Sequence, residues 1–276
     1  MKKLLSILLI LSFSFAAHAW DYRDSIKAVI AAKNSGGFGY CNDITDSDIM
    51  CEDFLGSTTC VSGESSTCRT SWSSITETGG TVAFDNVPSV GIGCTDLLTH
   101  TLKISKTVNT DTTCNAIYST SAKTSVHGVI YFKINSTNIP SGNELRILWI
   151  GQDTTTNFCL VFTLQNISGN FYIKTSHYNG SGYDNNTSVA SVSIDQWYPI
   201  NFTWDSGILA SANIDLNNDG DFNDTNEGLL NDNTDIGSRG AQYYGFGQEY
   251  TSTLLFSLEF ANIKFDSNTV PSFCSR

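Results

Sequence analysis

The residues with the clearest potential for chemistry lie in one acidic loop, residues 215–227. Asp215, Asn217 and Asp219 occupy positions 1, 3 and 5 of this loop, and Gly220 follows at position 6. This spacing is typical of the first half of an EF-hand-type calcium loop, because the glycine permits the sharp turn that folds oxygen ligands round one cation. We therefore predict a structural Ca²⁺ site, whose candidate ligands are Asp215, Asn217, Asp219, Asp221, Asn223, Asp224 and Glu227.

The second half of the loop departs from the EF-hand pattern. A bidentate glutamate is expected at position 12, but Asn226 stands there and Glu227 comes one residue later. Asp224 or Glu227 would close the site if the loop has a different geometry. The alternative is an acidic hairpin turn that binds no ion, because Asn-Asp-Gly is also common in turns.

A second set of polar residues alternates with apolar ones along three expected strands, 126–134, 158–165 and 171–178. Successive side chains of a strand point to opposite faces, so each strand has one apolar and one partly polar face. We expect the polar faces to line one groove in which aromatic rings and polar groups bind a glycan. The residues of this groove are His127, Tyr131, Lys133, Gln165, Tyr172, Lys174 and Tyr178.

Two other interpretations of these residues stay open. A polysaccharide lyase needs an acid and a base next to a uronate carboxylate, and His127 or His177 with Tyr131 or Tyr178 would supply them. Alternatively, the outer face of a sheet is polar only because it contacts water.

Glycosidase chemistry of the retaining type needs two carboxylates about 5 Å apart, and no E-x-D pattern is present to provide them. No G-x-S-x-G pattern indicates a serine hydrolase either.

The start of the chain predicts export. Two lysines precede an apolar stretch at residues 4–15, and Ala17-His18-Ala19 fits a signal-peptidase site. Residues 1–19 are therefore expected to be removed in an extracellular or periplasmic protein. The formal net charge of −12 opposes binding to nucleic acid or to an anionic membrane. The expected partner is a glycan or another surface component, and we expect a monomer.

The eight cysteines lie after the expected signal peptide, where an oxidising compartment favours disulfides. Zinc sites need pairs with C-x₂₋₄-C spacing, and no two cysteines here are that close. Proximity along the chain suggests the bridges Cys41–Cys51, Cys60–Cys68 and Cys94–Cys114, which leaves Cys159 and Cys274 as the fourth pair.

The elements that must position these residues are mostly short strands. One helix is expected at 24–33, where Asp24 caps it and Ile26, Val29 and Ile30 share a face. Residues 35–96 read as disulfide-stapled loops with a short strand at 81–84. Many strands separated by turn residues predict an all-β, two-sheet antiparallel jelly-roll sandwich. The later strands are expected at 100–105, 126–134, 144–151, 158–165, 170–178, 188–194, 197–204, 210–216 and 253–265.

Several segments resemble the concanavalin A-like lectin/glucanase and laminin G-like jelly-roll superfamily. In that superfamily a tryptophan begins a strand that feeds a hairpin, as Trp197 does in the segment 195–204. The segments 244–247 and 259–263 look like its last two strands, and 51–54 is similar to its acidic-aromatic start. The resemblance covers residues 51–266.

This resemblance implies a fold more than an activity, because the superfamily includes lectins, glycosidases, polysaccharide lyases and protein-binding modules. We expect a lead-in at 20–50 and one domain at 51–276. Its expected function is non-catalytic binding of a carbohydrate or surface component, with a structural calcium loop. The alternatives are a polysaccharide lyase and an adhesion protein without a small ligand.

Overall fold

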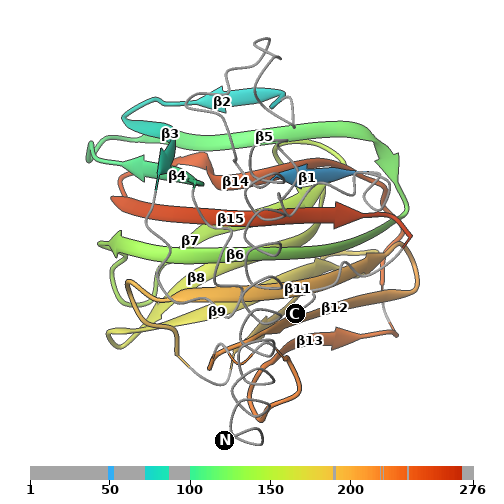
Figure 1. Cartoon of the computed structure of the whole chain (residues 1–276). Coiled ribbons are helices and arrows are strands. Elements are labelled where there is room, and N and C mark those ends of the chain that lie inside the picture. The colour runs from blue at the N-terminus through green and yellow to red at the C-terminus, as the bar shows by residue number, and fades with distance from the viewer. Residues whose placement is uncertain are drawn as a thin grey trace, which may run out of the picture. The chain divides into compact units, whose positions relative to one another are not determined.

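The computed structural model describes residues 49–52, 72–86, 100–188, 191–217, 219, 221–234 and 236–268. Every regular element within these residues is a β-strand (Figure 1). No described segment forms a helix with the length and apolarity of a membrane span. The expected signal peptide and the expected helix at 24–33 lie outside the described residues.

One antiparallel sheet has the strand order β13-β12-β11-β6-β15-β4-β3, and β1 pairs with β15 beside this path. We call it the eight-stranded sheet. Its strands are β1 (Met50–Glu52), β3 (Gly80–Asn86), β4 (His100–Lys106), β6 (Ser125–Thr137), β11 (Trp197–Asp205), β12 (Leu209–Ile214), β13 (Gly228–Asp232) and β15 (Phe256–Asp266).

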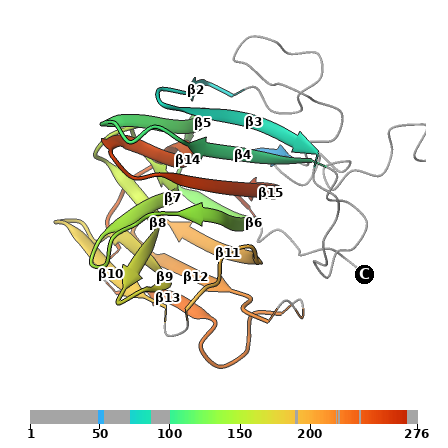
Figure 2. The same ribbon diagram turned by 90° about the vertical axis from the view of Figure 1, so that its left-hand side faces the viewer.

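The second antiparallel sheet has the order β10-β9-β8-β7-β14-β5-β2, and we call it the seven-stranded sheet. Figure 2 shows the two sheets as separate layers. The strands of the second sheet are β2 (Ser74–Thr76), β5 (Thr112–Lys123), β7 (Glu144–Gly151), β8 (Phe158–Ile167), β9 (Asn170–Tyr178), β10 (Tyr183–Thr187) and β14 (Ala241–Ser252).

The apolar core lies between the inner faces of the two sheets. Ile130 and Phe132 of β6 belong to it, as does Phe162 of β8. The rings of Phe162 and Phe202 meet across the layers at a centroid distance of 5.6 Å. Burial of such side chains is the main favourable term in folding. The expected all-β fold of two antiparallel sheets is therefore confirmed.

Each sheet also has a smaller apolar cluster on its outer face. Val129, Tyr131, Trp197 and Ala261 form the cluster of the eight-stranded sheet. Ile117, Trp149, Phe158 and Val161 form the cluster of the seven-stranded sheet, with Tyr243 packed against it. Trp149 and Trp197 thus lie on opposite outer faces of the sandwich.

A buried lysine fastens two loops at one end of the sandwich. Lys106, at the end of β4, is 1% exposed. Its ammonium group donates hydrogen bonds to the carbonyl oxygens of Val108 and Thr110 in the loop before β5, at 3.2 and 3.0 Å. It also donates to the carbonyl oxygens of Ser252, the last residue of β14, and of Leu254, between β14 and β15. Burial lowers the pKa of Lys106, although Cys114 and Asp111 oppose this effect.

The four predicted disulfide bonds are not confirmed. Cys114 and Cys159 are free, buried thiols, and burial raises the pKa of each to about 12. Both side chains lie in the core, and Cys159 does so at the register shift between Ile150 and Gly151, where β8 pairs with β7. The spacing of cysteines along the chain does not indicate which way their side chains point. The side chain of Cys51 and all of Cys41, Cys60, Cys68, Cys94 and Cys274 lie outside the described residues.

Candidate functional site

The residues of the predicted groove do not share one face. His127, Tyr131 and Lys133 stand on β6 of the eight-stranded sheet, whereas Gln165, Tyr172 and Lys174 stand on β8 and β9 of the seven-stranded sheet. Both sets point outward, and so they lie on opposite sides of the sandwich. Alternation predicts which face of a strand is polar, but it does not say to which sheet the strand belongs.

The predicted histidine–tyrosine pairs for a lyase are not brought together either. The ring nitrogens of His127 lie 3.0 Å from the hydroxyls of Ser125 and Thr203, while Tyr131 is 2% exposed in an apolar cluster. His177 is fully buried on the inner face of β9. Tyr178 follows on the opposite face, where its hydroxyl donates to the Gly180 carbonyl at 2.6 Å.

The outer face of the seven-stranded sheet has the more distinctive arrangement. Ile117, Gly245, Trp149 and Val161 are direct neighbours across β5, β14, β7 and β8. The indole of Trp149 lies so close over Gly245 that an added Cβ atom would come within 2.0 Å of it. The glycine therefore allows the tryptophan to lie flat against the sheet. Trp149 in turn meets the Phe158 ring edge-on at 5.3 Å.

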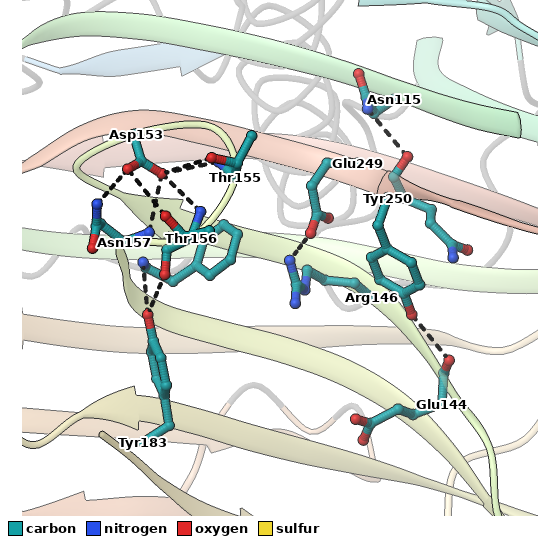
Figure 3. Close-up of polar contacts among 12 residues, drawn as sticks. Asn115, Glu144, Arg146, Asp153, Thr155, Thr156, Asn157, Tyr183, Glu249 and Tyr250 are labelled. Carbon is teal, nitrogen blue, oxygen red and sulfur yellow. Dashed lines mark hydrogen bonds and ion pairs between the residues drawn. The ribbon is translucent and has the colours of Figure 1, made fainter. Parts of the chain in front are cut away.

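Arg146 is the central charged residue of this face (Figure 3). Its guanidinium forms an ion pair with Glu249, and the two side chains are only 20% and 6% exposed. The same group lies over the rings of Phe158 and Tyr250, at 4.3 and 5.3 Å from their centroids. Burial lowers the pKa of Arg146, with Tyr250 and Glu144 opposing the effect.

Tyr250 connects this ion pair to the rim of the sheet. Its hydroxyl donates to the Glu144 carbonyl at 3.3 Å. Burial raises the pKa of Tyr250, and the positive charge of Arg146 only partly offsets this. The phenol is therefore protonated at neutral pH, because the ordinary value for tyrosine is already about 10.

Buried polar atoms without hydrogen-bond partners concentrate here. They include Nε of Arg146, Nε1 of Trp149 and Oε2 of Glu249. On β14, Gln248 is fully buried and neither atom of its amide has a partner. Asn115 donates to the Gln248 carbonyl at 3.1 Å, but its own Oδ1 has no partner. Native proteins satisfy most buried polar groups, so these atoms are exceptions, and others occur elsewhere in the fold, for example at Trp72 and Glu259. We call Asn115, Arg146, Trp149, Gln248, Glu249 and Tyr250 the Arg146 cluster.

An open pocket of about 830 Å³ adjoins the cluster. Glu144, Gln165, Lys174 and Tyr250 line it, and the Lys174 ammonium pairs with a Glu144 carboxylate oxygen at 2.9 Å. Gln165 and Lys174 are two of the sequence-predicted groove residues, so one part of that prediction falls at this pocket. The other pocket-lining residues are Asp111, Gly142, Asn143, Ser252, Thr253 and Leu254.

The loop between β7 and β8 borders the other end of the cluster (Figure 3). Asp153 Oδ1 accepts hydrogen bonds from the backbone N–H groups of Thr155, Thr156 and Asn157, at 2.8 to 3.0 Å. Tyr183 ties the same loop to β10, because its hydroxyl donates to the Thr156 carbonyl at 2.7 Å. Burial alone would raise the pKa of Asp153, but these hydrogen bonds lower it well below its usual range.

Acid should therefore loosen this loop. A carboxyl group with a depressed folded-state pKa stabilises the protein above its unfolded pKa, about 3.9 for aspartate, and this contribution is lost as the pH falls toward the folded value. We expect Asp153→Asn to melt at a lower temperature than wild type at neutral pH and to converge with it in acid. Melting temperatures from pH 7 downward measure this, and a constant difference at every pH would contradict it.

The acidic loop predicted to bind calcium follows β12. Asp215 and Glu227 are each 1% exposed. Glu227 accepts hydrogen bonds from the backbone N–H groups of Leu216 and Asp224, at 2.9 and 3.2 Å. Asn226 has a positive φ of 80°. This left-handed backbone conformation accommodates the one additional residue that separates Glu227 from position 12 of the EF-hand pattern. Burial, together with Asp215 and Asp224, raises the pKa of Glu227.

The remaining side chains of this loop are linked by short hydrogen bonds. The amide group of Asn217 donates to Asp219 and Asp224, at 3.1 and 2.7 Å. This amide therefore lies between two carboxylates, where a cation would be favourable. The loop carboxylates do not converge on a single point. Among the described residues, the one place where ligand atoms of three His, Cys, Asp or Glu side chains lie within 4.8 Å of one another is outside this loop.

Comparison with known proteins adds a fold relationship. No family model matches the sequence, and no curated protein sequence matches it. The solved structure of Cip1, a cellulose-induced protein, aligns over 82% of this chain and 100% of its own, with 10% identity and a TM-score of 0.53. The fold is shared with Cip1.

Two alginate lyases align less closely. The enzyme from Pseudomonas aeruginosa covers 67% of this chain and 86% of its own, with 11% identity and a TM-score of 0.44. That from Alteromonas sp. 272 covers 66% and 92%, with 11% identity and a TM-score of 0.42.

Sequence reasoning missed most of the Arg146 cluster. One available signal was Arg146 itself, a charged residue inside the otherwise apolar stretch Leu145 to Ile150. No signal linked it to Glu249, because the two residues meet only when β7 and β14 pair. Gly247, with a φ of 80°, and a register shift after Gln248 further obscure the alternation of β14.

Proposed function

We propose that this protein is an exported, non-catalytic glycan-binding domain of the jelly-roll type, and that the outer face of its seven-stranded sheet is the binding site. The observation that supports this most directly is the Arg146 cluster beside the open pocket. A pocket of about 830 Å³ is within the usual range for small-ligand sites.

The physical case rests on the polar side chains that line the pocket and on an exposed ring. Tyr250 is 39% exposed, so one part of its ring is accessible for stacking on a sugar face. Lys174 and Gln165 supply additional polar groups at the pocket.

The charges favour a neutral glycan over an acidic one. Lys174 already pairs with Glu144, and Arg146 already pairs with Glu249. An anionic polymer would have to displace these carboxylates and would also meet the net charge of −12. A neutral polysaccharide avoids both costs. Cip1, which has the same fold, is described as cellulose-induced, and this agrees with a polysaccharide ligand of that kind.

The geometry supports binding more than β-elimination. A lyase needs a base that is deprotonated at working pH, whereas burial raises the pKa of Tyr250. Neither His127 nor His177 stands on this face. Tyr250 beside Arg146 still offers an acid next to a cation, and lyase activity is therefore the alternative that the test must address.

A glycan array with the mature protein, followed by titration of the best ligand, tests this proposal. We expect binding to a neutral polysaccharide, and we expect Lys174→Met to weaken it about tenfold, equivalent to about 1.4 kcal/mol. Lys133→Met is the matched control, because Lys133 makes an ion pair of the same 2.9 Å length, with Glu259, on the opposite outer face. It should leave affinity unchanged.

Three outcomes would contradict the proposal. They are no binding to any glycan, equal losses in both lysine variants, and release of unsaturated uronate products that absorb in the ultraviolet. The last outcome would favour the lyase alternative.

We also propose that the loop 215–227 binds a structural calcium ion, as its ligand spacing suggests. The support for this proposal is the ligand spacing of the loop and the burial of two of its carboxylates, those of Asp215 and Glu227. Added Ca²⁺ should raise the melting temperature of wild type, and Glu227→Gln should abolish the increase because it removes one negative charge at the same shape. An equal increase in both proteins would exclude Glu227 as a ligand.

A further inference from the structure

The two sheets meet at one edge of the sandwich, around His177. β9 and β10 form this edge of the seven-stranded sheet, and β13 forms that of the eight-stranded sheet (Figure 2). The Thr175 hydroxyl on β9 lies 3.5 Å from the Leu229 carbonyl on β13, which connects the two edges.

Three potential metal ligands converge there. His177 is fully buried, and its Nε2 lies 3.2 Å from Oδ2 of Asp232 on β13. Asp184 on β10 stands directly opposite His177 in the strand ladder. One ligand atom from each of the three residues lies within 4.8 Å of the other two.

Both carboxylates are oriented by neighbouring donors. Asp232 Oδ1 accepts hydrogen bonds from the backbone N–H and the hydroxyl of Thr234, each at 3.0 Å. Asp184 Oδ2 accepts one from the Asn179 amide at 3.0 Å. Outer partners of this kind hold metal ligands in place in known sites.

The buried histidine provides a second, independent observation. Both ring nitrogens, including the Nε2 that faces Asp232, are buried without a hydrogen-bond partner, and an unpaired polar atom in the interior is costly. Two carboxylates and one imidazole also form a group with excess negative charge, which a divalent cation would neutralise.

We propose that His177, Asp184 and Asp232 bind a divalent transition-metal ion of the Zn²⁺ type. Zinc takes histidine nitrogen together with carboxylate oxygen in a four-coordinate site, and three protein ligands leave one position for water. Calcium prefers six to eight oxygen ligands. The ion would join β9 and β10 to β13 and so fasten the open edge of the sandwich. This site is separate from the Arg146 cluster and from the loop 215–227.

Equilibrium dialysis with Zn²⁺ on the chelator-treated full protein tests the site. Wild type should bind zinc, while His177→Gln and Asp184→Asn should each bind it at least about tenfold more weakly. His127→Gln is the matched control, because His127 likewise lies beside an aspartate, with Nε2 4.0 Å from Oδ1 of Asp205, although it is only partly buried. Its zinc affinity should equal that of wild type.

A thermal shift keeps the test independent of folding defects. Zn²⁺ should raise the melting temperature of wild type, and Asp184→Asn should fold but show no increase, because Asp184 is partly exposed on an edge strand. Mg²⁺ should have no effect on either protein. The proposal is overturned if wild type binds no zinc, or if both ligand variants bind it as wild type does.

Discussion

Arg146→Leu is expected to destabilise the protein by about 3–5 kcal/mol, the range for breaking a buried ion pair. The substitution leaves the Glu249 carboxylate, whose side chain is 6% exposed, without its positive partner. It also removes the guanidinium from the rings of Phe158 and Tyr250. The midpoint of urea unfolding measures the loss.

A second substitution separates the charge effect from lost packing. Adding Glu249→Gln removes the stranded charge and should recover a large part of the stability. Lys174→Met is the matched control, because its partner Glu144 is 40% exposed and such pairs contribute about 1 kcal/mol or less. Equal losses in Arg146→Leu and Lys174→Met, or no recovery in the double variant, would show that the Arg146–Glu249 pair is not a buried unit.

Lys106→Met is expected to cost about 3 kcal/mol, because it leaves several carbonyl groups without a donor. Methionine has a similar length and can fill the space. It cannot donate to the carbonyls of Val108, Thr110, Ser252 and Leu254, which the buried ammonium now joins. The two loops at this end of the sandwich should then separate more easily.

Urea unfolding of Lys106→Met and Lys264→Met compares a buried lysine with a partly exposed one. The second variant should change stability by no more than about 0.5 kcal/mol. If both variants are equally stable, the four carbonyl contacts of Lys106 add nothing to the fold.

The sequence predicted local properties of the strands well. Alternation at 126–134 and 158–165 identified Ile130, Phe132 and Phe162 as core residues, and the structure confirms them. The strands β6, β8 and β11 lie within a few residues of their expected positions. These strands could be predicted because their apolar residues recur at every second position, which reflects one buried and one exposed face.

Other elements were hidden by irregular patterns. The expected strand at 188–194 is wrong, since the part that is described holds only an isolated bridge between Val192 and Phe171. Alternation did not predict β14, because its two glycines and its register shift interrupt the pattern, and only the family resemblance placed a strand at 244–247. The Arg146 cluster was missed for a further reason, namely that β5, β7 and β14 are far apart in sequence and meet only through sheet pairing.

One titration tests the binding face most directly. The indole N–H signals of Trp149 and Trp197 report the outer faces of the seven- and eight-stranded sheets, respectively, and Trp204 reports the core. Adding the glycan to ¹⁵N-labelled protein should shift the Trp149 signal most, because Trp149 is the tryptophan on the proposed binding face. A shift of Trp197 with Trp149 unchanged would place the ligand on the opposite face and contradict the proposed site.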